Sequence, residues 1–329
     1  MRSMDQFGND LYTGKVSVPF VTRRKLWFLL AIVLVIGSAL VLLAKPPQFS
    51  IEFTGGSQFT VSGVEAPDQL VATDAVQEVV PDATTKVTTV GGTAIRVQTD
   101  QMTNDETLEV AASLADTYGV PTSQVTTSFI GPTWGADVTR QSLAGLGIFL
   151  ALAFLILAVY FRTWKMSAAA IIGLVDVLII TVGIYALAGF EISPAAVIGF
   201  LTILGYSLYD TTVVFDKIRE NTTEDGWKSG RTFGESVNLA VNQTLVRSIN
   251  TSVVAVLPVA AILFIGAIWL GAETLSDISL SITVGIIVAA YSTLFVAAPL
   301  YSLFREQEPD LRERDARLLE ARERATIDS

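Results

Sequence analysis

The chain has 329 residues, of which 51% are hydrophobic and only 16% are charged, and its mean hydropathy is +0.52. These values exclude an ordinary soluble domain and are typical of an integral membrane protein. The formal net charge is −10, and the chain contains neither cysteine nor histidine. Disulfides and thiolate chemistry are therefore excluded, and a proton carrier within the membrane has to be a carboxylate, assisted by tyrosine, hydroxyl groups or water.

Six apolar segments are long enough to cross a bilayer, which takes about 20 residues of helix. They are approximately 26–44, 143–161, 166–190, 192–215, 248–270 and 278–303. Between the third and fourth segments, Ser193 is expected to cap a new helix and Pro194 to occupy its first position. This pattern favours two helices over one long helix.

The distribution of lysine and arginine predicts the orientation. Basic residues precede the first span, fill the turn after the second, follow the fourth and continue beyond the sixth, whereas the turns around Glu191 and Glu273 contain none. By the positive-inside rule, both termini are expected in the cytoplasm. The first span is longer than the roughly 7 to 15 apolar residues of a cleavable signal, so we interpret it as a retained anchor. The expected regions are a cytoplasmic segment 1–25, a transmembrane helix 26–44, an extracytoplasmic domain 45–140, a five-helix remainder of the membrane domain 141–304 with a cytoplasmic loop 216–246, and a charged cytoplasmic tail 305–329.

The extracytoplasmic segment alternates between strand and helix patterns. The predicted elements are a strand 51–61, a helix 67–80, strands 86–90 and 94–98, a helix 104–118 and a strand 124–130. Gly91-Gly92 is expected to form the hairpin turn and Asn104 to cap the second helix, while Gly55-Gly56 is interpreted as a bulge or turn. The order βαββαβ predicts a ferredoxin-like α+β domain between the first and second transmembrane helices.

This domain is strongly acidic. Between residues 46 and 137 there are twelve acidic residues and two basic ones, Lys86 and Arg96, which gives the segment the same net charge as the whole chain. A well-hydrated surface accounts for such an excess. A docking face for basic, unfolded or lipid-associated clients is the alternative interpretation.

Asp210 lies near the end of the fourth apolar segment. A charged residue at membrane depth costs at least about 2.5 to 3.5 kcal/mol on insertion scales and usually marks a functional site. Thr202, Tyr206 and Ser207 lie on the same helical face. The fourth span therefore has one polar stripe that ends in a carboxylate.

Arg247, near the start of the fifth span, is expected at a depth similar to that of Asp210. Gln243, Thr244, Asn250 and Thr251 share its face. A static ion pair, or an arginine that extends to the inner membrane interface, would account for the charges. The functional alternative is a proton site at Asp210, where burial favours the neutral acid and Arg247 favours the carboxylate.

Two further acids could support such a site. Asp176 lies near the middle of the third span, where it could extend a proton path or be a protonated residue hydrogen-bonded across helices. Asp216 lies at the cytoplasmic end of the fourth span, with Lys217, Arg219 and Glu220 nearby. An interfacial salt-bridge cluster is the simpler interpretation there, and a proton entry or exit point is the alternative.

Several runs resemble the signatures of the bacterial SecF family. They are 205–221 (GYSLYDTTVVFDKIREN), 247–252 (RSINTS), 53–56 (FTGG) and the pair Gly131-Pro132 before the second span. The resemblance implies an export-accessory subunit of the resistance-nodulation-division superfamily that works with SecD beside the SecYEG channel. It also implies proton-transport roles for Asp210 and Arg247, with Tyr206, Ser207, Asp176, Asp216, Asn250 and Thr251 as possible supporting residues.

The same resemblance implies a multi-pass protein of the bacterial cytoplasmic membrane that is not an enzyme and uses the proton as coupling ion without another cofactor. The expected partners are a SecD-like subunit, the SecYEG channel, exported preproteins and the lipid bilayer, with no nucleic acid. Transporters of this type are commonly built from two related halves, and the chain contains one. Two other functions fit the residues: half of a drug or lipid efflux pump, or an intramembrane aspartyl protease that uses Asp176 and Asp210.

Overall fold

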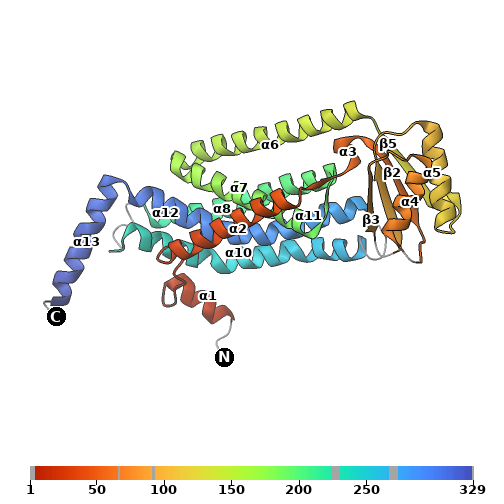
Figure 1. Ribbon diagram of the computed structural model, residues 1–329. Coiled ribbons are helices and arrows are strands. Elements are labelled where there is room, and N and C mark those ends of the chain that lie inside the picture. Colours follow the sequence, from red (N-terminus) through yellow and green to blue (C-terminus); the bar gives the residue numbers. More distant parts are fainter. Residues whose placement is uncertain (1–3, 66, 91–92, 224–229, 267–272, 328–329) are drawn as a thin grey trace.

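The structure is a computed structural model that describes residues 4–65, 67–90, 93–223, 230–266 and 273–327. Within these ranges, six helical segments are long and apolar enough to cross a membrane. They are α2 (Arg24–Ala44), α6 (Pro132–Phe161), α7 (Trp164–Ala188), α8 (Pro194–Asn221), α10 (Phe233–Phe264) and a last span, Leu275–Glu306. Each of the six predicted spans overlaps one of these segments, although α6 and α10 begin 11 and 15 residues before the predicted starts at 143 and 248, and residues 267–270 of the fifth prediction lie outside the described residues. The bundle is elongated, and a small α+β domain lies at one end of it (Figure 1).

The last span changes its helical geometry along its length. It comprises the α-helix α11 (Glu273–Ser292), the five-residue π-helix η3 (Thr293–Ala297) and the α-helix α12 (Ala298–Glu306). Short π-helical segments frequently occur at functional sites. The π-helix η3 is therefore a candidate part of a functional site.

Three of the spans form the centre of the bundle. More than half of the most apolar stretch of α7 and of the last span is buried inside the chain, compared with 6% in α2 and 11% in α6. Helices α8 and α11 approach closely, since a Cβ added at Gly199 would overlap Ser281 and one added at Gly285 would overlap Ile203. Small residues allow such contact between membrane helices. Helices α2, α6 and α10 lie outside this centre.

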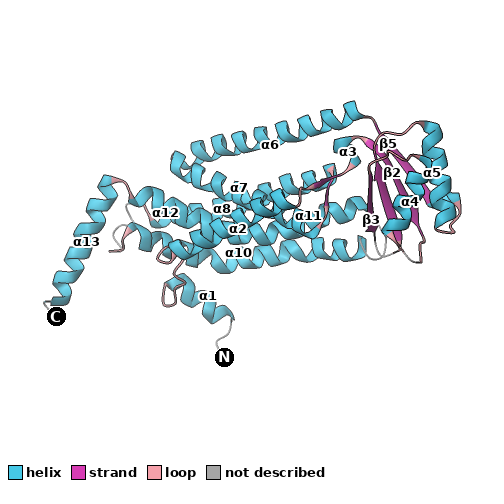
Figure 2. Ribbon diagram, in the orientation of Figure 1, coloured by secondary structure: helices cyan, strands magenta, loops and turns pink. Residues whose placement is uncertain are grey.

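The α+β domain contains one four-stranded antiparallel sheet and two helices (Figure 2). In chain order its elements are β2 (Gly56–Ser62), α4 (Gln69–Val79), β3 (Thr85–Val90), β4 (Ala94–Thr99), α5 (Asn104–Thr117), the short 3-10 helix η1 (Thr122–Gln124) and β5 (Val125–Ile130). The sheet order is β3-β4-β2-β5. Because side chains alternate along a strand, Ile95 and Val97 of β4 pack in the core with α4 and α5, whereas Arg96 and Gln98 lie on the opposite face.

The start of this domain differs from the prediction. The predicted strand 51–61 begins instead as the helical turn α3 (Ile51–Thr54), and β2 starts only at Gly56. Gly55 and Gly56 both have positive φ, 74° and 123°, which favours glycine. A Cβ at Gly55 would lie 2.9 Å from Cα of Pro132, so the turn also needs glycine to pack against the start of α6.

Other local predictions are confirmed or corrected. Ser193 caps α8 by accepting a hydrogen bond from the backbone N–H of Ala196, with Pro194 at the first position, as predicted. Thr103, and not Asn104, caps α5, because its side chain forms a capping box with Glu106. The predicted Gly91-Gly92 turn lies outside the described residues.

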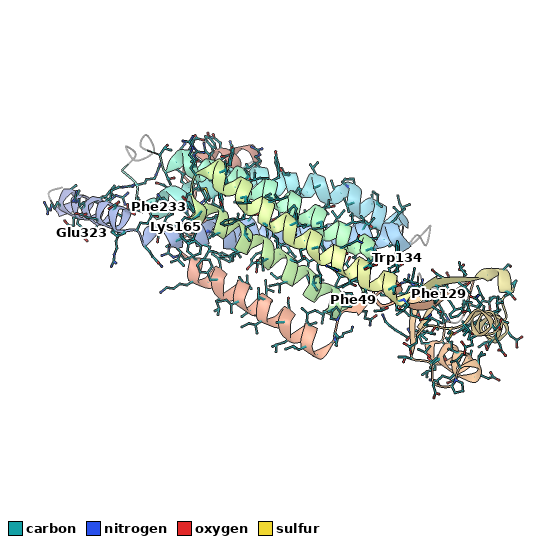
Figure 3. The ribbon with its side chains drawn as sticks, turned by 90° about the horizontal axis from the view of Figure 1, so that it is seen from above. Phe49, Phe129, Trp134, Lys165, Phe233 and Glu323 are labelled. Atoms are coloured by element: carbon teal, nitrogen blue, oxygen red, sulfur yellow. The ribbon has the colours of Figure 1, made fainter. Side chains whose placement is uncertain are left out.

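The predicted cytoplasmic loop 216–246 is mostly helical. Helix α8 continues to Asn221 and α10 begins at Phe233, because Thr232 and Glu235 form a capping box there. The N-terminal segment contains the helix α1 (Met4–Thr13), and the tail forms the helix α13 (Pro309–Ile327). Phe49, Phe129 and Trp134 lie where the bundle meets the α+β domain, whereas Lys165 and Phe233 lie toward the other end, near the tail (Figure 3).

Candidate functional site

Asp210 is held where α8 crosses α10. Its Oδ1 accepts a hydrogen bond from the hydroxyl of Ser248, with 2.9 Å between the oxygens. One turn away, the hydroxyl of Tyr206 donates to that of Ser252 at 3.3 Å. Each pair is separated by four residues along both helices, which is the spacing of neighbours on one helical face. The two helices are therefore joined by two successive polar contacts.

The second carboxylate oxygen of Asp210 is buried and has no hydrogen-bond partner among the described residues. The residue as a whole is only 5% exposed. On the adjoining face of α8, Thr211 shares a 3.0 Å hydroxyl contact with Thr293, the first residue of the π-helix η3. Asp210 is therefore enclosed by α8, α10 and the last span, with one oxygen available to a proton or a water molecule.

The static ion pair between Arg247 and Asp210, one of the alternatives that the sequence left open, is not formed among the described residues. No ion pair within 4.0 Å joins them among the described residues. The guanidinium donates a long, 3.4 Å hydrogen bond to the hydroxyl of Tyr209. Because α10 begins at Phe233, Arg247 lies near the middle of the helix and not near its start.

The supporting residues divide between the buried and exposed sides of these helices. Ser207 is buried, and Thr251 donates to the backbone oxygen of Arg247 within its own helix. Asn250 is exposed, as are Arg247 and Tyr209. Arg247 and Asn250 therefore lie on the outer side of α10, whereas Thr244, which was predicted on the same face, is buried, and Gln243 accepts a hydrogen bond from the side chain of Asn221.

Asp176 and Asp216 lie in other surroundings. Asp176 is buried in α7 near Ser292 of α11, whose hydroxyl donates to the backbone oxygen of Gly173 at 3.0 Å. Within the described residues, no hydrogen bond joins Asp176 to Asp210, so a shared-proton dyad is not present. Asp216 accepts a 3.0 Å hydrogen bond from the hydroxyl of Tyr160 in α6. Of the predicted salt-bridge cluster, Lys217 pairs with Glu220 at 2.7 Å, but among the described residues no ion pair includes Asp216.

Ser248 and Ser252, which contact Asp210 and Tyr206, were not among the predicted site residues, although both lie in the run 247–252. Ser248 and Ser252 follow Thr244 at intervals of four residues on α10, so a stripe of small hydroxyl residues was present as a signal. Within the part of the chain that the structure describes, no group of three or more acidic side chains is placed to hold a metal ion. The groups that the site does bring together are the buried carboxyl group of Asp210 and its hydroxyl neighbours.

Fold and site together define a class: a polytopic membrane protein with a small α+β domain inserted after its first span and a buried acid between its central helices. The family model for the C-terminal part of the protein export membrane proteins SecD and SecF matches residues 109–307, and that for the SecD/SecF GG motif matches residues 40–63. The protein translocase subunit SecF of Streptomyces coelicolor is 40% identical, over 98% of this chain and 86% of its own length. The chain belongs to the SecF family of protein translocase subunits.

Other relatives agree with this assignment. SecF of Mycobacterium tuberculosis is 36% identical over 96% of this chain and 73% of its own length. The crystal structure of SecDF from Thermus thermophilus, described as a translocon-associated membrane protein, superposes with a TM-score of 0.73 at 28% identity. That comparison covers 89% of this chain but only 39% of the SecDF chain, so the present chain corresponds to part of that longer protein.

Proposed function

We propose that the chain is a subunit of an accessory complex of the Sec translocase and uses the proton-motive force to assist preprotein export across the bacterial cytoplasmic membrane. The observation that supports this most directly is the buried Asp210, with one oxygen bonded to Ser248 and the other without a partner among the described residues. Such a carboxyl group can bind and release a proton when water reaches it from one side of the membrane and then from the other.

The proton route depends on α8 and α10 moving relative to one another. A change at the Asp210–Ser248 contact would alter the distance from Asp210 to Arg247, whose guanidinium is now held only by Tyr209 among the described residues. When Arg247 approaches, it stabilises the carboxylate and promotes release of the proton. Each proton that crosses the potential releases about 2.3 kcal/mol per 100 mV, so several protons suffice to drive a domain movement.

A second subunit is needed to cover the outer face of this site. Arg247, Asn250 and Tyr209 are exposed on the membrane-spanning helices α8 and α10, and Tyr209 is 56% exposed. An arginine facing lipid there would cost about 2.5 to 3.5 kcal/mol or more, whereas a protein neighbour with polar groups would satisfy it. We infer that a SecD-like subunit packs on this face and completes a two-half transporter.

The α+β domain lies outside the cytoplasmic face in this proposal, and both termini lie in the cytoplasm. The positive-inside distribution of basic residues supports this orientation. The βαββαβ order and the observed strand order support a ferredoxin-like arrangement. From this position the domain would contact preproteins as they leave the SecYEG channel, with the proton as the only coupling species and no nucleic acid involved.

The test is preprotein export into membrane vesicles that contain the Sec channel and the partner subunit. Asp210→Asn is expected to abolish the proton-dependent component and to leave the component driven by other energy sources unchanged. Asp74→Asn, at an exposed acid on α4, is the control for loss of a carboxylate. Proton-dependent export that persists with Asp210→Asn at equal complex abundance would contradict the proposal.

A further inference from the structure

Glu191 connects the membrane helices to the α+β domain. It belongs to the two-residue strand β6 (Glu191–Ile192) between α7 and α8. Its carboxylate accepts hydrogen bonds from the ammonium of Lys86 at 3.2 Å, from the guanidinium of Arg96 at 2.9 Å and from the amide of Gln98 at 3.1 Å. The Glu191 side chain is only 8% exposed. One acid of the membrane domain therefore binds three side chains of the sheet.

The two basic partners of Glu191 are unusual in this acidic part of the sequence. Lys86 and Arg96 are the only basic residues between positions 46 and 137, a segment with twelve acidic ones. They come from the neighbouring strands β3 and β4 and lie on the sheet face opposite the core. A general requirement for solubility does not explain why both point to one buried carboxylate. A specific attachment between the domain and the membrane helices does.

The backbone makes a second attachment at the same place. Strand β1 (Gln48–Phe49), in the linker after α2, pairs in parallel with β6, and the N–H of Ser50 donates to the carbonyl oxygen of Ile192 at 3.1 Å. A polar cavity of about 240 Å³ adjoins Glu191 and is also lined by Glu52 and Asp277. Ion pairs and hydrogen bonds beside a polar cavity can shift position without breaking an apolar core.

Helix α8 links this attachment to Asp210. It starts two residues after Ile192, with Ser193 as its cap, and runs as one α-helix from Pro194 to Asn221. At 1.5 Å per residue, Asp210 lies about 24 Å along the helix from Pro194. The hydroxyl of Ser193 also donates to Asp277 at 2.6 Å, at the start of the last span. An axial movement or rotation of α8 at Asp210 therefore reaches Glu191 through a continuous helix.

We propose that Glu191 is a coupling residue that ties the α+β domain to α8, so that a movement of α8 at the proton site displaces the domain. The driving force rests on the proposed function, but the attachment does not. Glu191 acts through Lys86 and Arg96 and is a positioning residue, since it touches neither the proton site nor, in this arrangement, a client.

A distance measurement tests the attachment directly. The natural chain has no cysteine, so Leu108→Cys on α5 and Leu187→Cys on α7, at side chains that are 70% and 65% exposed, accept two spin labels selectively. In the complex with a cysteine-free partner subunit, pulsed electron paramagnetic resonance is expected to give one narrow distance distribution. Glu191→Gln and Arg96→Gln should each broaden it and add longer distances, whereas Glu191→Asp should largely preserve it.

Glu52→Gln is the matched control, because Glu52 is another carboxylate that lines the same cavity and lies outside the Glu191 ion pairs. It should leave the distance distribution unchanged. A distribution for Glu191→Gln that is indistinguishable from that of Glu52→Gln would overturn the attachment.

Vesicle assays then separate coupling from proton movement. Glu191→Gln is expected to retain proton permeation and to lose the proton-dependent component of export at equal complex abundance. Full export with Glu191→Gln would overturn the coupling role. Failure of Asp210→Asn to change proton permeation would instead refute the proposed proton site, while the distance measurement would still decide the attachment.

Discussion

Ser248 determines how Asp210 is presented between α8 and α10. Its hydroxyl bonds one carboxylate oxygen at 2.9 Å and leaves the other without a partner among the described residues. A single hydrogen bond can orient a carboxyl group while leaving it able to exchange a proton. The role of Ser248 is therefore best tested by removing its hydroxyl without adding a new charge.

We expect Ser248→Ala to slow proton-dependent export by about tenfold, because a hydrogen bond to a charged group contributes about 1.5 kcal/mol or more. Ser248→Thr keeps the hydroxyl and should retain most of the activity. The measurement is the initial rate of export in vesicles with a fixed proton-motive force. Equal rates for Ser248→Ala and the parent protein would show that this contact is dispensable.

At the scale of single elements, α5 offers a test of pH dependence outside the membrane. The backbone N–H and side chain of Thr103 both donate to Glu106, and these hydrogen bonds lower the pKa of Glu106 from its usual 4.5. A lowered folded-state pKa stabilises the helix above the pKa of the unfolded chain, and this contribution is lost as the pH falls through the folded value. Helix α5 should therefore open more readily below about pH 4.5.

Hydrogen exchange of the α5 amides, measured on the full chain from pH 7 to pH 3 and corrected for intrinsic rates, checks this expectation. Thr103→Ala removes the cap and should raise the opening equilibrium about fivefold at pH 7, which corresponds to about 1 kcal/mol. It should also weaken the dependence on pH. The same pH dependence in Thr103→Ala and the parent would exclude the capping box as its cause.

The contact between α8 and α11 depends on glycine residues, which leave room for the side chains of the opposite helix. A Cβ at Gly285 would overlap the side chain of Ile203, whereas one at Gly147 of α6 would meet nothing within 4 Å. We expect Gly285→Ala to lower the free energy of unfolding by about 1 to 3 kcal/mol, as overpacking does in tight interiors. Gly147→Ala should not destabilise the protein. Thermal unfolding of both variants in detergent provides the comparison.

The elements also show how far local patterns predict structure. Apolar length located the six spans, and alternation located β3, β4 and β5, because both signals are local. The turn α3 was missed because its four residues favour a strand, while the positive φ angles of Gly55 and Gly56 and the packing on Pro132 are set by tertiary contacts.

The candidate site was predictable only in part. Asp210 was predicted as a site residue because a charged side chain in the membrane costs free energy. Its hydrogen-bond partner, Ser248, could not be predicted because it depends on the rotation of α10 about its axis. That rotation is set by residues 233–247, which form the first half of α10. Because many of these residues are polar, the apolar pattern did not predict them as part of the fifth helix. Asn242, for example, is buried because its side chain bonds the backbone N–H and oxygen of Val18. The same rotation turns Ser248 toward Asp210 and Arg247 outward.

At the scale of the whole molecule, the end of the bundle near the tail is tied together by polar contacts. Arg24, at the start of the first span, pairs with Glu306 at the end of the last, and Lys165 pairs with Glu308 at 2.9 Å. Both carboxylate oxygens of Glu235 accept hydrogen bonds from Arg322 of the tail, at 2.9 and 2.8 Å. At the other end, Glu191 holds the α+β domain. These contacts hold each end together as a unit. We therefore expect the two ends to move relative to one another, along α8 and α10.

An exposed polar face lies beside Asp210. Thr202, Gly205 and Tyr209 are exposed along α8, and Arg247 and Asn250 are exposed on α10. A Cβ at Gly205 would meet nothing within 4 Å, so this glycine is not required by packing within the chain. Glycine on an exposed face of a membrane helix allows the close approach of another helix.

We therefore expect Gly205→Leu to reduce the amount of SecD-like partner that copurifies with the chain by about tenfold or more, because a large side chain would hold the two halves apart. Gly147→Leu, at an equally open glycine on α6, is the matched control and should leave copurification unchanged. Both variants should retain the unfolding temperature of the isolated chain, since neither glycine packs within it. Equal copurification of the two variants would place the partner on another face, and the exposed Arg247 would then need a different explanation.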